Sequence, residues 1–417
     1  MKFFYNLFVH LFPFFIRVAS IWNPKAALWV NGRKEQFERL RWAVGQSSKP
    51  IIWFHTASLG EFEQGRPVIE EVRLKYPGYR ILLTFFSPSG YEIRKNYTGA
   101  DIVFYLPMDT RHNACLFLEI TAPQLAIFIK YETWYNYLSV LKQKGVPSLL
   151  VSAVVYSHQF SFSSWASFMK KTLALFTHIF AQNDDALDLL KAHHIETYYS
   201  LGGDTRYDRV KTLSDVPFQH YGIEQFLNNK AALVAGSTWH EDEKMLANLM
   251  NEQSRLKLII APHEISSKNI SFLKDLFQQS ILFSELDKIK NPEFYSVLII
   301  DNIGLLSKLY RYATIAYVGG GFNQAGIHNV LEATVYGNIV LFGSNYSKSN
   351  EAKEMIELSL AYPFSTKVEL VNIVDTLFNK PEELNQKNLI TKQFIEQRIG
   401  ATKKVLALIE KHQFLNF

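Results

Sequence analysis

The sequence predicts an α/β protein built from two Rossmann-like domains, each with a doubly wound parallel sheet. From Pro50 onward, short apolar runs alternate with amphipathic stretches, which is typical of parallel strands joined by helices. The length of 417 residues exceeds what one hydrophobic core organises and fits two domains of roughly 150–200 residues. Because ligands bind at the carboxyl ends of such strands, we expect the functional site in a cleft that both sheets face.

Short apolar runs predict the strands. In the first half they cover residues 51–56, 80–85, 102–105, 125–130, 148–152 and 179–181, and in the second half 232–235, 257–261, 296–300, 315–318 and 339–342. Amphipathic stretches predict helices, for example over 62–76, 134–144, 241–252, 305–312 and 329–336. The two blocks meet near residues 201–209 at a Gly-Gly-Asp turn. We therefore expect domains over 23–203 and 204–417.

Residues 1–22 form a separate element, with eight aromatic and no acidic residues. Polar residues and one proline recur every three or four positions and so share one helical face: Lys2, Asn6, His10, Pro13 and Arg17. The opposite face is apolar: Phe4, Leu7, Phe8, Leu11, Phe14 and Phe15. This pattern favours a membrane-associating helix that lies in the bilayer interface.

Other interpretations of this helix stay open. A single membrane span and a core helix are both possible, whereas the lack of a small-residue cleavage site after Arg17 argues against a secretory signal. Lys25, Arg33 and Lys34 follow the helix and favour placing the rest of the chain on the cytoplasmic side.

Composition excludes several classes of protein. With 48% hydrophobic and 20% charged residues, the chain is neither disordered nor a coiled coil. The single cysteine, Cys115, excludes a disulfide framework and a cysteine-rich zinc site. The 44 basic and 39 acidic residues leave a net charge of +5, which is too mild for a dedicated nucleic-acid binder and compatible with anionic substrates or an anionic membrane.

Two strand ends of the first domain carry a carboxylate. Ser58 and Glu61 follow the run 51–56 with the spacing of a capping box, in which Glu61 binds the backbone at a helix start. Glu61 also suits a general base that the helix dipole keeps ionised, with Gly60 letting a substrate approach. Glu132 follows the run 125–130 beside aromatic residues. Spacing alone does not decide whether Glu61 is a helix cap or a general base. For Glu132, a solvated surface side chain is as good an interpretation as a functional carboxylate.

Glycine-rich turns mark two strand ends of the second domain. After 232–235 comes Gly-Ser-Thr, where Thr238 and Glu241 have capping-box spacing. After 315–318 come three glycines and then Gly-Ile-His-Asn-Val-Leu-Glu, which ends at Glu332. The dinucleotide signature fails because Gln324 stands where its third glycine is required, and the P-loop fails because Ile327 stands where its lysine is required. The pattern therefore predicts a phosphate site of another kind, at a helix that starts near Asn329.

Together these segments resemble the 3-deoxy-D-manno-octulosonic acid (Kdo) transferase family. The matching stretches are Asn-Pro-Lys at 23–25, Gly-Arg at 32–33, His-Thr-Ala-Ser-Leu-Gly-Glu at 55–61, Tyr-Leu-Pro-Met-Asp at 105–109, Ala-Pro-Gln-Leu-Ala-Ile-Phe-Ile-Lys-Tyr-Glu-Thr-Trp at 122–134, Gly-Ser-Thr at 236–238, Gly-Gly at 319–320 and Gly-x-His-Asn-x-Leu-Glu at 326–332. The similarity runs in order from about residue 23 to 350.

The resemblance implies a GT-B fold and a glycosyltransferase. It implies CMP-Kdo as donor, a lipid A precursor as acceptor in lipopolysaccharide synthesis, and a place on the cytoplasmic face of the inner membrane, with no metal or other cofactor. Glu61 would be the general base of an inverting transfer, supported by Glu132 and Arg206. CMP would contact Pro262, His263, Ile303, Gly304, Leu305, Asn329, Val330, Leu331 and Glu332, and the acceptor would meet Lys25, Arg33, Ser58 and Gly60.

The chain departs from the family pattern at three places. Pro262-His263-Glu264 stands where the family has Pro-Arg-His, Gly304-Leu305-Leu306 where it has Gly-Glu-Leu, and residues 152–156 lack the usual arginine. A GT-B enzyme with another nucleotide sugar and a catalytically inactive membrane-associated relative are therefore the alternatives. An NAD-dependent enzyme is a more distant one, because the glycine pattern fails.

Overall fold

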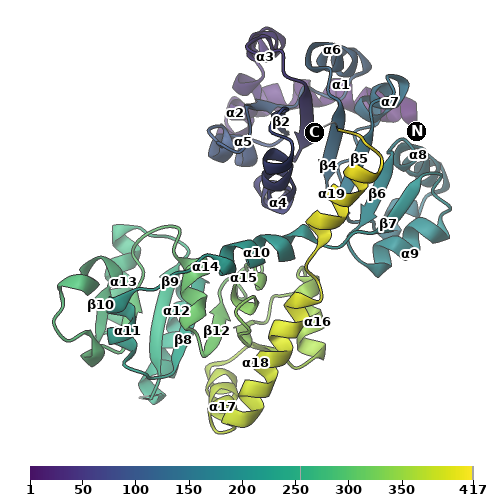
Figure 1. The fold of residues 1–417 in the computed structure, drawn as a ribbon. Coiled ribbons are helices and arrows are strands. Elements are labelled where there is room, and N and C mark those ends of the chain that lie inside the picture. Colours follow the sequence, from purple (N-terminus) through teal and green to yellow (C-terminus); the bar gives the residue numbers. More distant parts are fainter. Residues whose placement is uncertain (254, 416–417) are drawn as a thin grey trace. The chain divides into compact units, whose positions relative to one another are not determined.

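The computed structural model describes residues 1–253 and 255–415. The chain forms two compact units (Figure 1): unit 1 comprises Met1–Arg209 and Ile399–Phe417, and unit 2 comprises Val210–Arg398. The chain passes from unit 1 to unit 2 within helix α10 (Thr205–Asp215) and returns just before α19 (Ala401–Lys411). The expected boundary between 203 and 204 lies close to the first crossing. The sequence analysis placed residues 204–417 in one domain and did not predict that the C-terminal residues return to unit 1.

Unit 1 contains a seven-stranded sheet in the order β3-β2-β1-β4-β5-β6-β7, with every pair parallel. The strands are β1 (Ile51–His55), β2 (Arg80–Phe85), β3 (Ile102–Tyr105), β4 (Leu125–Ile129), β5 (Ser148–Ala153), β6 (His178–Ala181) and β7 (Tyr198–Leu201). β1 and β4 are buried along their whole length, as expected for central strands covered on both faces. Six strands were predicted; β7 was missed because this edge strand is partly exposed and carries no apolar run.

Helices cover both faces of this sheet. They are α1 (Lys2–Ala19), α2 (Pro24–Gly32), α3 (Gln36–Gly45), α4 (Leu59–Lys75), α5 (Pro88–Arg94), α6 (Arg111–Thr121), α7 (Tyr135–Gln143), α8 (Ser163–Leu173), α9 (Asp184–Ala192) and α19. One core joins the sheet to α4 and α19, which lie in front of it in Figure 1, and a second core joins the other face to α3, α6, α7 and α9. The C-terminal helix thus completes the core of unit 1.

Unit 2 repeats the architecture with the order β10-β11-β9-β8-β12-β13-β14, again all parallel. Its strands are β8 (Ala232–Thr238), β9 (Lys257–Pro262), β10 (Ser280–Leu282), β11 (Val297–Ile299), β12 (Ile315–Val318), β13 (Val340–Gly343) and β14 (Ala361–Phe364). Its helices are α11 (Tyr221–Leu227), α12 (His240–Glu252), α13 (Ser267–Leu276), α14 (Leu306–Leu309), α15 (Leu331–Thr334), α16 (Asn350–Glu357), α17 (Lys367–Phe378) and α18 (Pro381–Glu396). The α/β fold with two Rossmann-like units is therefore confirmed.

Two local expectations for unit 2 were wrong. The helix expected over 329–336 is the short α15, and α12 is capped one residue later than predicted. Because β8 extends to Thr238, Trp239 occupies the N-cap, and its N–H donates to Asp242 rather than to Glu241, at 2.9 Å. The carboxylate that closes the turn is thus buried Asp242.

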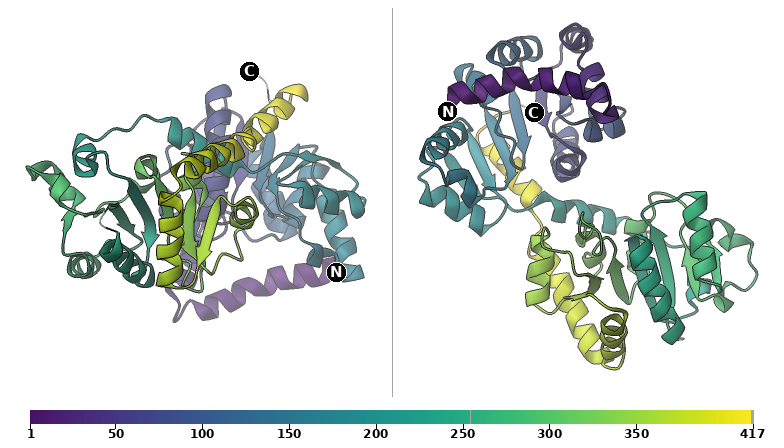
Figure 2. Two further views of the ribbon diagram at one scale, coloured as in Figure 1. Left: turned by 90° about the horizontal axis from the view of Figure 1, so that it is seen from below. Right: turned by 180° about the vertical axis from the view of Figure 1, so that it is seen from behind.

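Helix α1 lies along unit 1 and is seen best from behind in Figure 2. Val9 is buried, whereas the predicted apolar face, from Phe4 to Phe15, is exposed. The Tyr5 hydroxyl donates to Asp109 at 2.5 Å, and the Asn136 amide donates to Asn6 at 2.9 Å. Of the helices in residues 1–253 and 255–415, none is long and apolar enough to cross a membrane.

Candidate active site

The centre of the unit 1 sheet is where the strand order reverses, between β1 and β4. In doubly wound sheets such a point opens a crevice at the carboxyl ends of the strands. The segment after β1 leads to Glu61 at the start of α4, and the segment after β4 carries Glu132. The two carboxylates expected at strand ends therefore come from the two strands that flank this point.

Glu61 is held by the start of its own helix. Its Oε2 accepts the N–H of Ala57 at 2.5 Å and the N–H of Ser58 at 3.1 Å, with Ser58 at the N-cap. The predicted capping-box geometry is therefore confirmed. Both bonds end on Oε2, and the carboxylate also has a side-chain hydrogen bond with Tyr131. Gly60 is exposed, with open space where a side chain would begin.

Glu132 is fixed by two ring nitrogens. Its Oε2 accepts the indole N–H of Trp134 at 2.6 Å and lies 3.3 Å from Nε2 of His55. Glu61 and Glu132 are only 3% and 6% exposed. The interpretation of Glu132 as a solvated side chain is thus wrong, because it is buried and held in place.

The two carboxylates interact electrostatically. Burial, followed by the charge of Glu132, raises the pKa of Glu61 to about 7, against the opposing effects of the two N–H bonds and of Lys130. The sequence analysis expected the helix dipole to keep Glu61 ionised. Burial and the charge of Glu132 raise the pKa by more than the helix start lowers it. Burial and the same two carboxylates raise the pKa of Tyr131 to about 12. A carboxylate with a pKa near 7 is suited to accepting a proton at neutral pH.

Arg206, at the start of α10, belongs to a network that reaches α4. Its Nε donates to Asp204 Oδ2 at 2.8 Å, and its Nη2 lies 2.7 Å from the same oxygen. Asp204 also accepts the side-chain amides of Gln64, at 3.0 Å, and Gln182, at 2.8 Å. Because Gln64 lies one turn after Glu61 on α4, this network ties Arg206 to the helix that carries Glu61.

The two basic residues predicted to bind the acceptor have different surroundings. Lys25 is exposed in the first turn of α2. The Arg33 guanidinium donates to the carbonyls of Trp29, Phe86 and Leu106 at 2.9–3.2 Å and lies over the Trp29 ring at 3.9 Å. Burial lowers the pKa of Arg33 to about 9. Arg33 thus ties α2 to the loops after β2 and β3, and its role toward an acceptor stays a prediction.

In unit 2, three rings stack at the corresponding strand ends. The rings of Trp239 and His263 lie 4.4 Å apart, and those of His263 and His328 4.8 Å apart. The Trp239 indole N–H donates to His328 Nε2 at 3.3 Å. Burial and His263 lower the pKa of His328. These side chains follow β8, β9 and β12, so the stack occupies the switch point of the second sheet.

The other predicted nucleotide contacts differ in what they can offer. The side chains of Val330 and Leu331 are buried in the core, so a ligand would meet only their backbone. Asn329 is exposed, and its amide donates to Glu332 at 3.4 Å. Pro262 is buried at the end of β9, whereas Ile303, Gly304 and Leu305 lie in an open turn where Gly304 has φ +93°.

The glycines after β12 are explained by packing within the protein. A Cβ on Gly319 would lie 2.3 Å from the Ser237 carbonyl oxygen, and one on Gly320 would lie 2.6 Å from the Gly326 carbonyl oxygen. A Cβ on Gly321 would meet the Gly343 backbone at 2.5 Å. The sequence analysis predicted a phosphate site at this glycine-rich turn. The close contacts between these loops already require glycine at the three positions, without any ligand.

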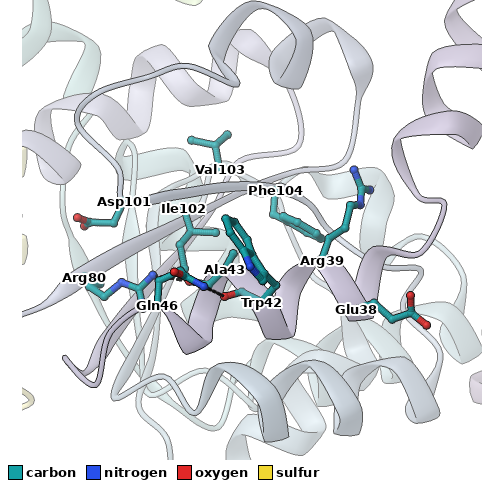
Figure 3. Close-up of a pocket in the computed structure, with 10 residues that line it drawn as sticks. All are labelled: Glu38, Arg39, Trp42, Ala43, Gln46, Arg80, Asp101, Ile102, Val103 and Phe104. Atoms are coloured by element: carbon teal, nitrogen blue, oxygen red, sulfur yellow. Dashed lines mark hydrogen bonds between the residues drawn. The ribbon is translucent and has the colours of Figure 1, made fainter.

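A depression of about 580 Å³ lies elsewhere on unit 1, between α3 and the edge strand β3 (Figure 3). The Trp42 ring, 71% exposed, projects over it, and Arg80 lies at one end. None of the site residues predicted from the sequence lines this depression. Within the described part of the chain, no three His, Cys, Asp or Glu side chains are grouped as metal ligands.

Sequence analysis gave no role to several residues that the structure brings to these sites. His55, Trp239 and His328 lie in or beside the quoted motifs, so the sequence alone could have indicated a role for each. Thr84, whose hydroxyl lies 2.9 Å from His55 Nδ1, comes from β2 and had no local signal. Asp204 lies in the Gly-Gly-Asp turn, but its bonds to Gln64 and Gln182 arise only through the fold.

Comparison with known proteins shows which enzymes the chain resembles. A sequence model described as 3-Deoxy-D-manno-octulosonic-acid transferase (kdotransferase) matches residues 33–209. The 3-deoxy-D-manno-octulosonic acid transferase of Aquifex aeolicus (strain VF5) is 27% identical, over 84% of this chain and 93% of that protein. The enzyme of the same description from Rickettsia bellii (strain RML369-C) is 26% identical, over 91% and 93%. The chain is thus similar to Kdo transferases over most of its length, and it is a glycosyltransferase.

Solved structures support the fold of this glycosyltransferase. The UDP-GlcNAc 2-epimerase from Neisseria meningitidis matches 87% of the chain and all of its own with a TM-score of 0.60 and 15% identity. MurG of Acinetobacter baumannii matches 87% of the chain and 99% of its own with a TM-score of 0.56 and 11% identity. At these identities the likeness concerns the fold alone, and it is the GT-B fold that was expected.

Proposed function

We propose that the protein transfers Kdo from CMP-Kdo to a hydroxyl group of a lipid A precursor. The similarity to Kdo transferases over most of the chain supports this donor and acceptor. The observation that carries the chemistry is the buried pair of Glu61 and Glu132, in which the pKa of Glu61 is raised to about 7. Such a carboxylate holds a proton weakly enough to be ionised and strongly enough to remove one from a hydroxyl group.

In the proposed reaction, Glu61 acts as the general base. Oε1 of Glu61 takes the proton of the acceptor hydroxyl while the hydroxyl oxygen attacks the anomeric carbon of Kdo. The bond between that carbon and the phosphate oxygen of CMP breaks, CMP leaves with the electron pair, and the configuration inverts. No metal takes part. Oε2 remains bound to the Ala57 and Ser58 N–H groups, so the cap and the base use different oxygens.

Glu132 and Arg206 have supporting roles in this proposal. Glu132 raises the pKa of Glu61 through its charge. A guanidinium offsets negative charge that develops on a departing phosphate, and the bonds to Asp204 hold Arg206 in one orientation. CMP is proposed to bind unit 2 at the residues after β9, β11 and β12.

The exposed apolar face of α1 supports a place at the membrane. Phe4, Phe8, Phe14 and Phe15 are each at least 61% exposed, whereas the opposite side of the helix is tied to unit 1 through Tyr5 and Asn6. A helix so divided lies in the bilayer interface, with its apolar side in the lipid. We propose that α1 holds the enzyme on the cytoplasmic face of the inner membrane, where Lys25 meets the acceptor's phosphates.

One observation favours a second candidate donor. His263 stands in the ring stack where the family pattern has arginine, so the nucleotide contacts of this chain differ from those of the family. A different nucleotide sugar is therefore the alternative. Competition for the enzyme by CMP and by UDP separates the two.

Replacing Glu61 tests the proposed base. Glu61→Gln keeps the size of the side chain but cannot take the proton, so we expect transfer to fall by at least the ~10²–10⁴-fold typical of general-base loss. The measurement is CMP release from CMP-Kdo with membranes that contain lipid A precursor. Glu71→Gln, an exposed position on the same helix, is the control and should transfer at the wild-type rate. A fully active Glu61→Gln enzyme that binds CMP normally would exclude Glu61 as the base.

A further inference from the structure

The inner side of α1 contacts a buried carboxylate, that of Asp109. Asp109 follows β3 and is 0% exposed. Its Oδ2 accepts the Tyr5 hydroxyl at 2.5 Å and the N–H of Asn136 at 3.0 Å, and its Oδ1 accepts the N–H of Tyr137 at 2.8 Å. One carboxylate therefore joins the helix with the exposed aromatic face to the first turn of α7.

Asp109 takes the place of a local side-chain cap on α7. The first N–H groups of a helix have no partner within the helix, and a side chain at the N-cap usually accepts one of them. In α7 the N-cap is Trp134, whose indole can only donate. The Asp109 carboxylate supplies the acceptors instead. The start of α7, and with it Trp134, is thus held by a residue that α1 also binds.

Trp134 in turn holds Glu132. Its indole N–H donates to Glu132 Oε2 at 2.6 Å, and both residues belong to the turn between β4 and α7. A shift of the helix start would therefore move the donor of this bond. His55, on the central strand β1, lies 3.3 Å from the same oxygen. The position of Glu132 thus depends on the attachment of α7 as well as on the sheet.

Further contacts of α1 reach the same segment. The ring of Phe12, on α1, lies 6.0 Å from that of Phe86 after β2, and the Phe86 ring lies 4.9 Å from that of Trp134. Asn6 adds a polar contact, since its side-chain oxygen accepts the side-chain amide of Asn136 at 2.9 Å. The apolar and the polar contacts of α1 therefore converge on the turn between β4 and α7.

We propose that Tyr5 is a positioning residue for the transfer reaction, which acts through Asp109 and the start of α7 on Glu132. The exposed side of α1 meets the lipid, while its inner side orients a carboxylate beside the base. α1 is then part of the support of the active site as well as a membrane attachment. The proposal rests on the proposed roles of Glu61 and Glu132.

Loosening this attachment should slow the chemical step and leave substrate binding intact. Glu132 acts on Glu61 through its charge, and that effect depends on the distance between the two carboxylates. The donor is proposed to bind unit 2, and the lipid is proposed to meet the exposed side of α1, so neither uses the Tyr5 hydroxyl. A change at Tyr5 is therefore expected in kcat rather than in KM or in membrane attachment.

The test is Tyr5→Phe, which keeps the ring and removes the hydroxyl that donates to Asp109. We expect kcat for CMP release to fall about tenfold, since a small misplacement of a catalytic group can cost up to ~10²-fold, while the KM for CMP-Kdo and vesicle binding stay unchanged. Tyr198→Phe, at a 78% exposed position on β7, is the control and should behave as wild type. An unchanged kcat in Tyr5→Phe would overturn the proposal.

The indole N–H of Trp134 gives a readout that does not depend on catalysis. In protein labelled with ¹⁵N-tryptophan, its NMR signal is identified by its absence from the Trp134→Phe spectrum. Because this N–H is bonded to Glu132, we expect Tyr5→Phe to shift the signal, whereas the signal of the 71% exposed Trp42 stays in place. An unmoved Trp134 signal would overturn the proposal.

Asn6→Ala is a second variant if Tyr5→Phe fails to fold. It removes the partly exposed side chain that accepts the Asn136 amide, so it loosens the same attachment of α1 to α7. We expect a loss of kcat and a shifted Trp134 signal, as for Tyr5→Phe. The absence of both changes would overturn the proposal.

The two readouts separate this proposal from the proposed function. If Glu61→Gln proved fully active, the role of Glu61 as the base would fail. A Trp134 signal that responds to Tyr5→Phe would still establish the link from α1 to Glu132, because that signal does not depend on transfer.

Discussion

At the scale of single residues, Glu61 carries two tasks on one carboxylate. Oε2 closes the first turn of α4 through two backbone bonds, and the carboxylate also contacts the Tyr131 side chain. The cap restricts the side chain to one orientation and uses Oε2, whereas the proposed reaction uses Oε1. Burial and the neighbouring Glu132 then raise the pKa of Glu61 to about 7. Its position and its proton affinity therefore have separate causes, and different substitutions can change each.

Replacing Glu132 should alter the proton affinity of Glu61. In Glu132→Gln the negative charge that raises the pKa of Glu61 is gone, so the pKa falls and the base is ionised at lower pH. We expect the acidic limb of the transfer rate, which lies near pH 7 in the wild type, to move down by about one pH unit. A rate profile measured with CMP release checks this. A limb that stays near pH 7 would show that Glu132 does not set the proton affinity of the base.

Residue-scale features were predictable where they are local. The capping spacing of Ser58 and Glu61 lies within four residues, and the structure has it. The pairing of His55 with Glu132 joins residues from two strands, and Thr84 comes from a third. No spacing in the sequence encodes those contacts, because sheet order and register create them.

At the scale of elements, α1 has two sides with different environments. Val9 is buried and packs with Trp29 and Met108, and Tyr5 and Asn6 hold the helix to the loop after β3 and the first turn of α7 through Asp109 and Asn136. Burial raises the pKa of Asp109 to about 7, although three donors oppose the shift. The aromatic side faces away from unit 1. The helix is thus fixed by polar contacts at one end and keeps its apolar side exposed.

Polar substitutions on the apolar side should release the protein from membranes. Phe8 and Phe15 are 61% and 62% exposed, so Phe8→Ser with Phe15→Ser should leave the fold intact. Because burying a phenylalanine contributes roughly 1.5–3 kcal/mol, we expect vesicle binding to fall at least tenfold in a flotation assay. Phe162→Ser with Phe294→Ser, at exposed positions away from α1, is the matched control. Equal binding by both double variants would contradict interfacial docking through α1.

Buried strands were the most predictable elements. β1, β2 and β4 are apolar runs covered on both faces, so hydrophobicity alone marks them. The edge strands β7 and β10 and the strand β14 carry partly exposed residues and left little signal. α15 is shorter than predicted because a turn over residues 335–337, with Gly337 at φ +87°, follows it directly. Burial on both sides decided how clearly a strand could be recognised.

At the scale of the whole molecule, the two units divide the proposed work. The carboxylate pair belongs to unit 1 and the ring stack to unit 2, each at the point where strand order reverses. The strand–helix alternation predicted both sheets. The return of α19 to unit 1 could not be predicted, because an amphipathic C-terminal helix fits either sheet equally well.

The ring stack should govern nucleotide binding without affecting the base. In His263→Ala the ring that stacks on both Trp239 and His328 is lost, so we expect CMP to bind at least tenfold more weakly by calorimetry. The pH limb of the remaining activity should not move. CMP should compete with the wild-type donor better than UDP does. Preferential competition by UDP would favour the alternative nucleotide sugar.

The most direct test of the central claim is a mass measurement on the lipid product. Wild-type protein is incubated with CMP-Kdo and membranes that contain lipid A precursor, and both CMP release and the mass of the lipid are followed. We predict lipid-dependent release of CMP and a lipid heavier by one or more Kdo units, both abolished by Glu61→Gln. No release and no heavier lipid, from folded protein that still binds CMP, would contradict the assignment of donor and acceptor.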